Sequence, residues 1–252
     1  MHQAGYEALD LRWVYVPFAV RPEDLAGALA GMRGLAIRGF GVSMPFKIDV
    51  LPLLDRLDPL AQRIGAANTI VNDDGVLSGH NTDAEGAARA LEEAIGSLAG
   101  ARCTVLGAGG AARAVVHGLA ARGAVVSVAN RTRASAETLA REAGATTIDW
   151  SERAATSADV IVNATSAGMD IGAGPTESPL AGTMIPKAVT VMDIVYKPIE
   201  TNLIADARAA GARVVSGGRM LLYQAASQFE LYTGQKAPLE AMDRALVAAI
   251  GG

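Results

Sequence analysis

The sequence contains a single cysteine, Cys103, which excludes an intramolecular disulfide. No apolar run approaches the roughly 20 residues that a membrane-spanning helix needs, and the N-terminus shows no signal-peptide pattern. The formal net charge of −4 contains no block of like charge, which argues against nucleic-acid or membrane-surface binding. We therefore expect a cytoplasmic protein in which Cys103 is a small buried residue at the start of a strand.

The composition indicates a folded protein with a substantial core. Half of the 252 residues are hydrophobic and only 19% are charged, the reverse of the balance that produces disorder. Short β-branched runs alternate with alanine-rich helical stretches, which is typical of an α/β fold with a largely parallel sheet. We predict two domains that share a tight junction: residues 1–83, completed by C-terminal helices over 219–252, and residues 84–218.

The period of hydrophobicity predicts the individual elements. The first part should contain strands over 12–20 and 37–44, helices over 21–34 and 45–57, a hairpin at the Asp74-Gly75 turn, and then a helix over 84–98. A compact βαβ series follows in the segments 103–123, 125–132, 134–144, 159–169 and 189–196. Two helices should fill 219–250.

The segment TVLGAGGAARAVV carries the clearest nucleotide signal. Gly107-x-Gly109-x-x-Ala112 directly follows an apolar strand and opens an alanine-rich helix, the context of the dinucleotide fingerprint. Glycines let the backbone turn sharply and approach a pyrophosphate, whose charge is attracted by the N–H groups at the helix start. A glycine turn also occurs for packing alone, so the prediction depends on the whole strand-loop-helix-strand context.

The end of the next strand indicates which dinucleotide binds. An NAD site usually has Asp or Glu there, about 20 residues past the glycines, whereas this chain has Asn130-Arg131-Thr132 followed by Arg133. A guanidinium can pair with a 2′-phosphate that a carboxylate would repel. The sequence therefore favours NADP, with NAD as the alternative; the simpler explanation is a solvated arginine at a strand end.

Two charged residues, Lys47 and Asp83, stand at predicted strand-to-helix junctions. The crevice beyond the strand ends of open α/β folds is where ligands collect. An amine and a carboxylate brought together there could handle the proton that accompanies hydride transfer to a ketone. Each residue alone is more simply a helix-start charge or part of a structural ion pair, and the amides Asn68 and Gln224 would ordinarily serve the backbone.

Taken together, a set of segments resembles the shikimate dehydrogenase family, in the family's order and over nearly the whole chain. These segments are GVSMPFK, IGAANTIV, GHNTDAEG, GAGGAARAV, NRT, NATSAGM, DIVYKP and MLLYQAASQFELYTG. The resemblance implies a two-domain α/β fold, with an N-terminal substrate domain and a Rossmann-type NADP-binding domain with a parallel sheet. It also implies NADP-dependent, reversible reduction of 3-dehydroshikimate to shikimate, in the biosynthesis of chorismate and aromatic amino acids.

The resemblance assigns roles to individual residues. Lys47 is similar to the residue that handles the hydroxyl proton, and Asp83 to its catalytic partner. The implied substrate contacts are Ser43, Asn68, Tyr196 and Gln224. The implied cofactor side comprises Gly107, Ala108, Gly109, Gly110, Ala111, Asn130, Arg131, Thr132 and Thr165, with Ile194 near the nicotinamide.

The chain departs from the family pattern in several places. It begins partway through the family's first helix, so we expect either a truncated N-terminus or an atypical member without the preceding strand and the serine loop that holds the substrate carboxylate. Gly41 replaces a frequent asparagine, and Arg219 stands where a glycine commonly lies near the nicotinamide. A cation at that position could meet a carboxylate. Ser135 replaces an arginine that follows the Asn-Arg-Thr motif, and Arg133 is the candidate substitute.

Three other functions stay open at this point. The first is a quinate or dual quinate/shikimate dehydrogenase, which could use NAD. The second is a catalytically silent nucleotide-binding homologue. The third is a methylenetetrahydrofolate dehydrogenase-like enzyme, against which Lys47, Asn68, Asp83 and Gln224 argue as a set. The sequence does not predict the oligomeric state.

No metal site is predicted. The three histidines, His2, His80 and His117, show no ligand spacing. Each is more simply a surface or packing residue. We expect a small-molecule substrate and no nucleic-acid or membrane partner.

Overall fold

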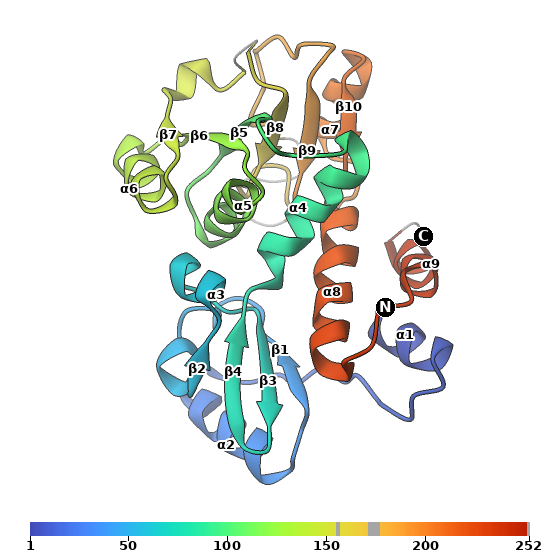
Figure 1. Ribbon diagram of the computed structural model, residues 1–252. Helices are drawn as coiled ribbons and strands as arrows, with labels where there is room; N and C mark the ends of the chain where they lie inside the picture. Colours follow the sequence, from blue (N-terminus) through green and yellow to red (C-terminus); the bar gives the residue numbers. More distant parts are fainter. Residues whose placement is uncertain (155–156, 171–176, 251–252) are drawn as a thin grey trace. The chain divides into compact units, whose positions relative to one another are not determined.

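The computed structural model describes residues 1–154, 157–170 and 177–250. The chain divides into two compact units, Met1–Thr82 with Gln224–Ala248 and Asp83–Tyr223 with Ala249–Gly252 (Figure 1). Within the described residues, no helix is both long and apolar enough to span a membrane.

A four-stranded sheet in the order β1-β3-β4-β2 forms the centre of the first unit. Strand β3 pairs antiparallel with β1 and β4, and β2 pairs parallel with β4. The β3–β4 hairpin turns at Asp74 and Gly75, which have φ angles of 51° and 89°, as the Asp-Gly pair predicts. The elements are α1 (His2–Ala8), η1 (Pro22–Asp24), α2 (Leu25–Gly34), β1 (Gly39–Gly41), η2 (Leu51–Leu53), β2 (Arg56–Leu57), α3 (Pro59–Ile64), β3 (Thr69–Asp73) and β4 (Val76–His80), with most of α8 (Gly217–Thr233) and α9 (Leu239–Ile250).

Helix α2 covers this small sheet and closes its core. Leu29 and Met32 of the helix pack with Ile70 of β3 and Leu77 of β4 in a buried cluster. The Asn72 side chain donates a hydrogen bond of 3.1 Å to the Met32 carbonyl oxygen, which fixes the end of α2 to β3. This core supports the loops that carry the predicted substrate-side residues.

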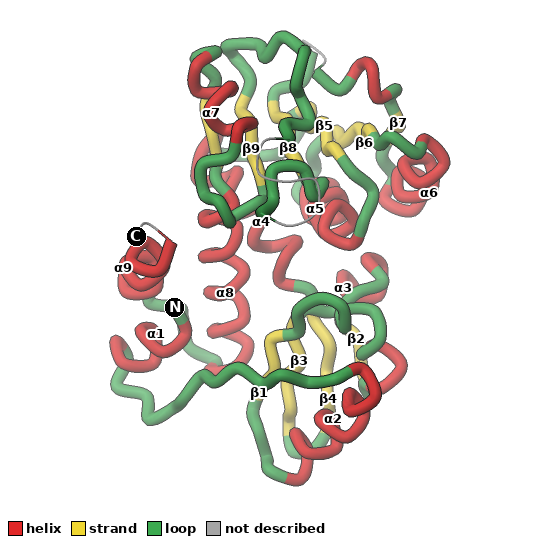
Figure 2. Tube along the Cα trace, turned by 180° about the vertical axis from the view of Figure 1, so that it is seen from behind, coloured by secondary structure: helices red, strands yellow, loops and turns green. Residues whose placement is uncertain are grey.

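The predicted strand over 12–20 is wrong, because residues 11–21 form neither helix nor strand (Figure 2). A strand needs a neighbour for its backbone N–H and C=O groups, and no strand among the described residues pairs with this segment. Apolar side chains of the segment are consequently exposed, including Val14 (77%), Val16 (52%) and Phe18 (60%).

The predicted helix over 45–57 is also wrong. The segment forms turns, the short 3₁₀ helix η2 and strand β2. Pro45 and Pro52 have no backbone N–H, and Pro52 stands where a helix would need a hydrogen bond to the residue four positions back. Short-range bonds hold the segment instead, such as the 3.0 Å bond from the Phe46 N–H to the Ser43 carbonyl oxygen.

The second unit is built on six parallel strands in the order β10-β9-β8-β5-β6-β7. This arrangement confirms the predicted parallel sheet of the Rossmann type. The elements are α4 (Thr82–Ile95), β5 (Arg102–Leu106), α5 (Gly110–Ala121), β6 (Val125–Ala129), α6 (Arg133–Ala143), β7 (Thr146–Thr147), η3 (Trp150–Glu152), β8 (Val160–Asn163), β9 (Thr190–Asp193), α7 (Asn202–Ala209), β10 (Arg213–Val215) and the start of α8.

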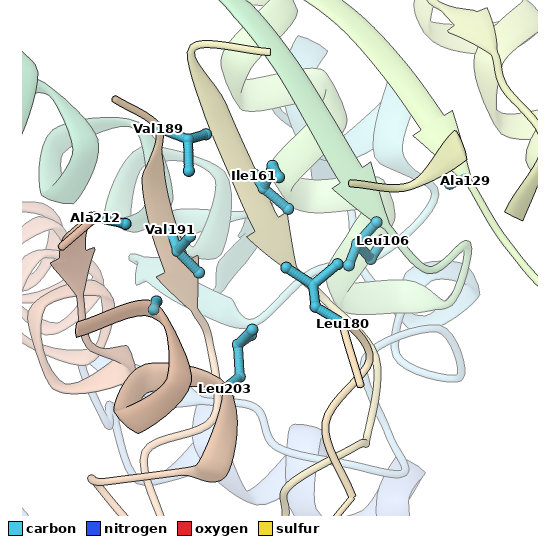
Figure 3. Close-up of a cluster of buried hydrophobic side chains, with 9 residues drawn as sticks. Leu106, Ala129, Ile161, Leu180, Val189, Val191, Leu203 and Ala212 are labelled. Carbon is cyan, nitrogen blue, oxygen red and sulfur yellow. The ribbon is translucent and has the colours of Figure 1, made fainter. Parts of the chain in front are cut away.

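A hydrophobic cluster locks three neighbouring strands of this sheet together (Figure 3). Leu106 of β5, Ile161 of β8 and Val191 of β9 pack with Leu203 of α7 and with Leu180. All five side chains are at most 2% exposed. The cluster fixes the strands whose carboxyl ends carry the candidate site.

Candidate active site

The parallel strands place the predicted cofactor residues along one edge of the second unit's sheet. Leu106, the last residue of β5, is in register with Ala129 of β6 and with Asn163 of β8, and Asn163 is in register with Asp193 of β9. Strand order reverses beside β5, which is where open α/β sheets bind ligands. The loops that start at this edge, together with the first turn of α5, contain the predicted residues Gly107 to Ala111, Asn130 to Thr132, Thr165 and Ile194.

Gly107 opens the glycine loop in a conformation that favours glycine. Its φ angle is +111°, and an added Cβ would lie 2.8 Å from the carbonyl oxygen of Ala164. Its N–H donates a 2.8 Å hydrogen bond to the carbonyl oxygen of Ala129. Gly107 therefore lets the loop contact the ends of both neighbouring strands.

The start of α5 can receive an anion. Gly109 is the N-cap residue, and no side chain caps the helix there. Gly109 and Gly110 are exposed, and a Cβ added at either would meet no described atom within 4 Å. The first N–H groups of the helix thus lie beside open space at its positive end. These residues fit the pyrophosphate of a dinucleotide.

The loop after β6 presents one arginine to solvent. Arg131 is exposed and forms no hydrogen bond or ion pair with another described residue. Arg133, the candidate substitute from the sequence, is held by Glu137 at 2.8 Å and by Asp149. Arg131 is therefore the arginine of this loop that is available to a 2′-phosphate.

A buried carboxylate, Asp193, joins the loops after β8 and β9. Its Oδ1 accepts hydrogen bonds from Asn163 Nδ2 (2.9 Å) and from the Val195 N–H (3.1 Å). Its Oδ2 accepts a 2.6 Å bond from Thr201 Oγ1. Asn163 Oδ1 in turn accepts from the N–H (3.0 Å) and Oγ1 (2.7 Å) of Thr165. The network therefore fixes both loops.

Asp193 is 0% exposed, and burial raises the pKa of its carboxyl group, against the lowering effect of its hydrogen bonds. Asp193 and Asn163 lie in the DIVYKP and NATSAGM segments, but neither was predicted as a site residue. Each is a polar residue that ends an otherwise apolar strand, in VIVN and TVMD, and that signal could have identified them. The bond between Asn163 and Asp193 joins two strands that lie 30 positions apart, so it is visible only in the folded chain.

Asn68 organises the predicted substrate side of the first unit. Its side chain is buried, and its Oδ1 accepts hydrogen bonds from the Thr82 N–H (2.7 Å) and from Thr69 Oγ1 (2.9 Å). Its Nδ2 donates to Thr82 Oγ1 at 3.0 Å and lies 3.5 Å from Gln224 Oε1. Two predicted substrate contacts, Asn68 and Gln224, therefore lie side by side.

Ser43 and Lys47 lie on a segment that runs beside Asn68. The Val42 N–H donates a 2.7 Å bond to the Asn68 carbonyl oxygen, and the Ala67 N–H donates a 2.8 Å bond to the Lys47 carbonyl oxygen. Ser43 is exposed and Lys47 is partly buried. The first unit thus brings these three predicted residues into one region.

Asp83 and Tyr196, the other predicted catalytic and substrate-side residues, belong to the second unit. Asp83 lies in the first turn of α4, directly after Thr82, and is partly buried. Tyr196 is 47% exposed in the loop after β9. It follows Val195, whose N–H is bound by Asp193, so the network also positions this stretch of backbone.

A buried polar cluster around Gln228 was not predicted. Gln228 Nε2 donates to the Asn68 carbonyl oxygen (3.2 Å) and to Thr69 Oγ1 (3.0 Å), and its Oε1 lies 3.2 Å from His2 Nε2. The His2 ring stacks on Tyr15 with centroids 4.3 Å apart. Burial lowers the pKa of His2 to about 4, although the bond to Gln228 opposes this. His2 is therefore neutral near pH 7, and through Gln228 it supports Asn68 and the start of β3.

Arg219, which departs from the family pattern, has a carboxylate partner. Its guanidinium donates hydrogen bonds of 2.8 and 2.6 Å to the two oxygens of Glu93 and lies 5.4 Å from the ring centroid of Tyr223. Arg219 and Glu93 line a cavity of about 420 Å³ together with Ser216 and Ile199. Arg219 thus ties the start of α8 to α4 within the second unit.

Among the described residues, no group of three or more His, Cys, Asp or Glu side chains could hold a metal ion. His80 lies 3.6 Å from Asp58, and His117 is buried in α5. Cys103 is buried at the start of β5, as predicted, and burial raises the pKa of its thiol to about 12. None of these residues lies in the loops at the carboxyl ends of the parallel strands.

Three stretches of the chain match known families. Residues 1–70 match the shikimate dehydrogenase substrate binding domain, residues 89–171 match shikimate / quinate 5-dehydrogenase, and residues 217–247 match the shikimate 5′-dehydrogenase C-terminal domain. A shikimate dehydrogenase (NADP(+)) from Moorella thermoacetica is 45% identical over 262 residues, which cover 100% of this chain and 88% of that protein.

Solved structures show the same similarity over the whole chain. A shikimate dehydrogenase in complex with NADP+ is 37% identical with a TM-score of 0.93, and the match covers 99% of this chain and 89% of that one. A shikimate 5-dehydrogenase from Thermus thermophilus, in complex with NADP(H) and shikimate, is 38% identical with a TM-score of 0.91. That match covers 98% of this chain and 92% of the Thermus chain.

Proposed function

The chain belongs to the shikimate dehydrogenase family, and we infer that it catalyses the NADP-dependent, reversible reduction of 3-dehydroshikimate to shikimate. The observation that carries this inference is the succession of three family matches on a chain whose parallel strand ends present the glycine loop and Arg131. The protein is thus an oxidoreductase of the shikimate pathway, which supplies chorismate and the aromatic amino acids.

The cofactor is NADP, as in the relatives that match the whole chain. When bound, it supplies the hydride for reduction and accepts it in the reverse direction. The uncapped start of α5 would hold its pyrophosphate, and Arg131 would hold its 2′-phosphate. Ile194 and Thr165 follow β9 and β8 and would lie toward the nicotinamide end.

We assign proton transfer to Lys47 and Asp83. Lys47 would donate a proton to the carbonyl oxygen as that carbonyl is reduced. In the reverse direction Lys47 takes the proton of the shikimate hydroxyl. The Asp83 carboxylate would orient the amine and accept a hydrogen bond from that hydroxyl. The assignment is supported by the GVSMPFK and GHNTDAEG motifs.

The substrate hydroxyls need several fixed hydrogen-bonding groups, and we assign this role to Ser43, Asn68, Tyr196 and Gln224. Asn68 suits it because its bonds to Thr82 hold the amide in one orientation. We propose residues 1–83 with 219–252 as the substrate domain and residues 84–218 as the dinucleotide domain. The low and evenly spread charge supports a cytoplasmic enzyme with a small-molecule substrate and no nucleic-acid or membrane partner.

Initial rates test this function directly. The chain as sequenced should reduce NADP+ with shikimate as substrate, and this rate should exceed the rates with quinate or with NAD+. Faster turnover of quinate would instead identify a quinate dehydrogenase of the same family. NADP+ binding without turnover of either substrate would identify a silent nucleotide-binding homologue, and the proposed reaction would then be wrong.

A further inference from the structure

Arg133 follows the loop that we assign to the 2′-phosphate, but two carboxylates already hold its guanidinium. Arg133 Nε donates to Glu137 Oε1 at 2.8 Å, and Arg133 Nη1 pairs with Asp149. Both carboxylates raise the pKa of Arg133, so the guanidinium stays charged. The three side chains together carry a net negative charge next to Arg131.

The register of the sheet brings Asp149 close to Arg133. Strand β7 is the parallel neighbour of β6, with Thr147 in register with Val128, and the Ile148 N–H donates to the Val128 carbonyl oxygen at 3.1 Å. The carboxyl ends of β6 and β7 therefore lie at the same edge of the sheet. Asp149 leaves that edge beside the point where β6 leads into the loop of Arg131.

The Asp149 carboxylate is also held in place by its own backbone surroundings. Its side chain accepts a hydrogen bond from the backbone N–H of Glu152, and Glu152 Oε2 accepts the Asp149 N–H at 3.2 Å, which together form a capping box. A carboxylate held in this way keeps its position whether or not the cofactor is bound. It can therefore compete with the 2′-phosphate for Arg133.

We propose that Asp149 is a specificity-determining residue: by holding Arg133, it leaves Arg131 alone to recognise the 2′-phosphate and so limits the preference for NADP over NAD. The proposal rests on the proposed function, because it takes the loop after β6 as the 2′-phosphate site. A phosphate monoester carries about −1.5 to −2 charges at neutral pH, so it gains when a second guanidinium is released from one of its two carboxylate partners.

Equilibrium binding tests the proposal without relying on turnover. The dissociation constants of NADP+ and NAD+ are measured by titration calorimetry for the natural chain, Asp149→Asn, Arg133→Ala and the double variant. Asp149→Asn should lower the dissociation constant of NADP+ roughly threefold to tenfold and change that of NAD+ by less than about twofold. Arg133→Ala alone should change the dissociation constant of NADP+ by less than about twofold, because Glu137 and Asp149 already hold the Arg133 guanidinium. In the double variant the gain of Asp149→Asn should disappear.

Asp206→Asn is the matched control. Asp206 is an exposed acidic residue on α7, which packs against β9 and β10, at the opposite end of the strand order from β7. The Asp206→Asn substitution removes one negative charge, as Asp149→Asn does, but leaves the partners of Arg133 in place. It should leave both dissociation constants unchanged. An equal gain from Asp206→Asn, or a gain of Asp149→Asn that survives in the double variant, would overturn the proposal.

The outcomes also separate this proposal from the function on which it rests. If Arg131→Ala weakens NADP+ selectively while Asp149→Asn changes nothing, the 2′-phosphate site stands and the role of Asp149 is wrong. If neither dinucleotide binds the natural chain, the proposed function and the role of Asp149 fail together. Selective tightening of NADP+ by Asp149→Asn supports both.

Discussion

Replacing Thr201 with valine tests the buried network that fixes the loops after β8 and β9. Thr201 is 1% exposed, and its Oγ1 donates to Asp193 Oδ2 at 2.6 Å and accepts the Ile204 N–H at 3.3 Å. Valine has nearly the same shape without the hydroxyl. Thr201→Val therefore removes both hydrogen bonds and leaves the packing almost unchanged.

The magnitude follows from these two bonds. Loss of the N-cap of α7 costs about 1 kcal/mol, and loss of a hydrogen bond to a buried carboxylate costs about 1.5–3 kcal/mol. We therefore expect the free energy of unfolding of the second unit to fall by about 2–4 kcal/mol. In a chain of this size, that corresponds to a fall in melting temperature of roughly 5–15 °C.

The fall in the free energy of unfolding caused by Thr201→Val should depend on pH. Burial raises the pKa of Asp193 and the bond from Thr201 lowers it, so removing the bond raises this pKa further. A carboxyl group with a raised folded-state pKa stabilises the fold while protonated, and that stability is lost as the pH rises through the folded-state pKa. The deficit of Thr201→Val should therefore be larger at about pH 8 than at about pH 5.

Urea unfolding followed by tryptophan fluorescence measures this deficit. The chain has two tryptophans, Trp13 in the first unit and Trp150 in the second, so a Trp13→Phe background reports the second unit alone. Thr201→Ser keeps the hydroxyl and should stay within about 1 kcal/mol of the natural chain. A Thr201→Val variant within about 0.5 kcal/mol of the natural chain at pH 8 would refute the assigned role of the network.

Further predictions concern the catalytic pair, the cofactor loops and pH. Lys47→Ala should lower turnover by roughly 10²–10⁴-fold with little change in NADP+ affinity; near-normal turnover would refute its role. Arg131→Ala should weaken NADP+ far more than NAD+ in binding titrations, whereas equal losses would count against a 2′-phosphate contact. Gly107→Ala should lower the melting temperature and weaken both dinucleotides, because its φ angle is +111° and its Cβ would contact a backbone oxygen; an unchanged melting temperature would contradict this. Because burial lowers the pKa of His2 to about 4, the free energy of unfolding of the first unit should rise from pH 4 to about 6.5, by up to about 3 kcal/mol, and His2→Asn should flatten this slope in urea titrations.

The parallel sheet could be predicted from sequence because its signals are local. The central strands β5, β6, β8 and β9 are short, mostly apolar runs, and the glycine loop lies between one such run and an alanine-rich helix. The segment over 12–20 has the same β-branched composition but forms no strand, because a strand also needs a partner. Pro52 was the overlooked local signal against a helix over 45–57.

The candidate site likewise contains residues that the sequence predicts and contacts that only the fold creates. The glycine loop, Arg131 and the motifs of Lys47 and Asp83 are contiguous in sequence, so they could be named in advance. The contacts of Asp193 with Asn163 and Thr201 join residues that lie up to 30 positions apart and depend on strand order. The occupation of Arg133 by Asp149 likewise depends on the register of β7 with β6, which the sequence does not reveal.

The buried thiol of Cys103 makes the natural chain suitable for site-specific labelling. With a pKa of about 12, only about one thiol in 10⁵ is ionised at pH 7, and the thiolate is the form that reacts with maleimides. Leu35 in the first unit and Met184 in the second are 75% and 86% exposed, so cysteines introduced there would take dyes while Cys103 stays unmodified. A donor and acceptor pair at these positions would follow the separation of the two units through a catalytic cycle by energy transfer.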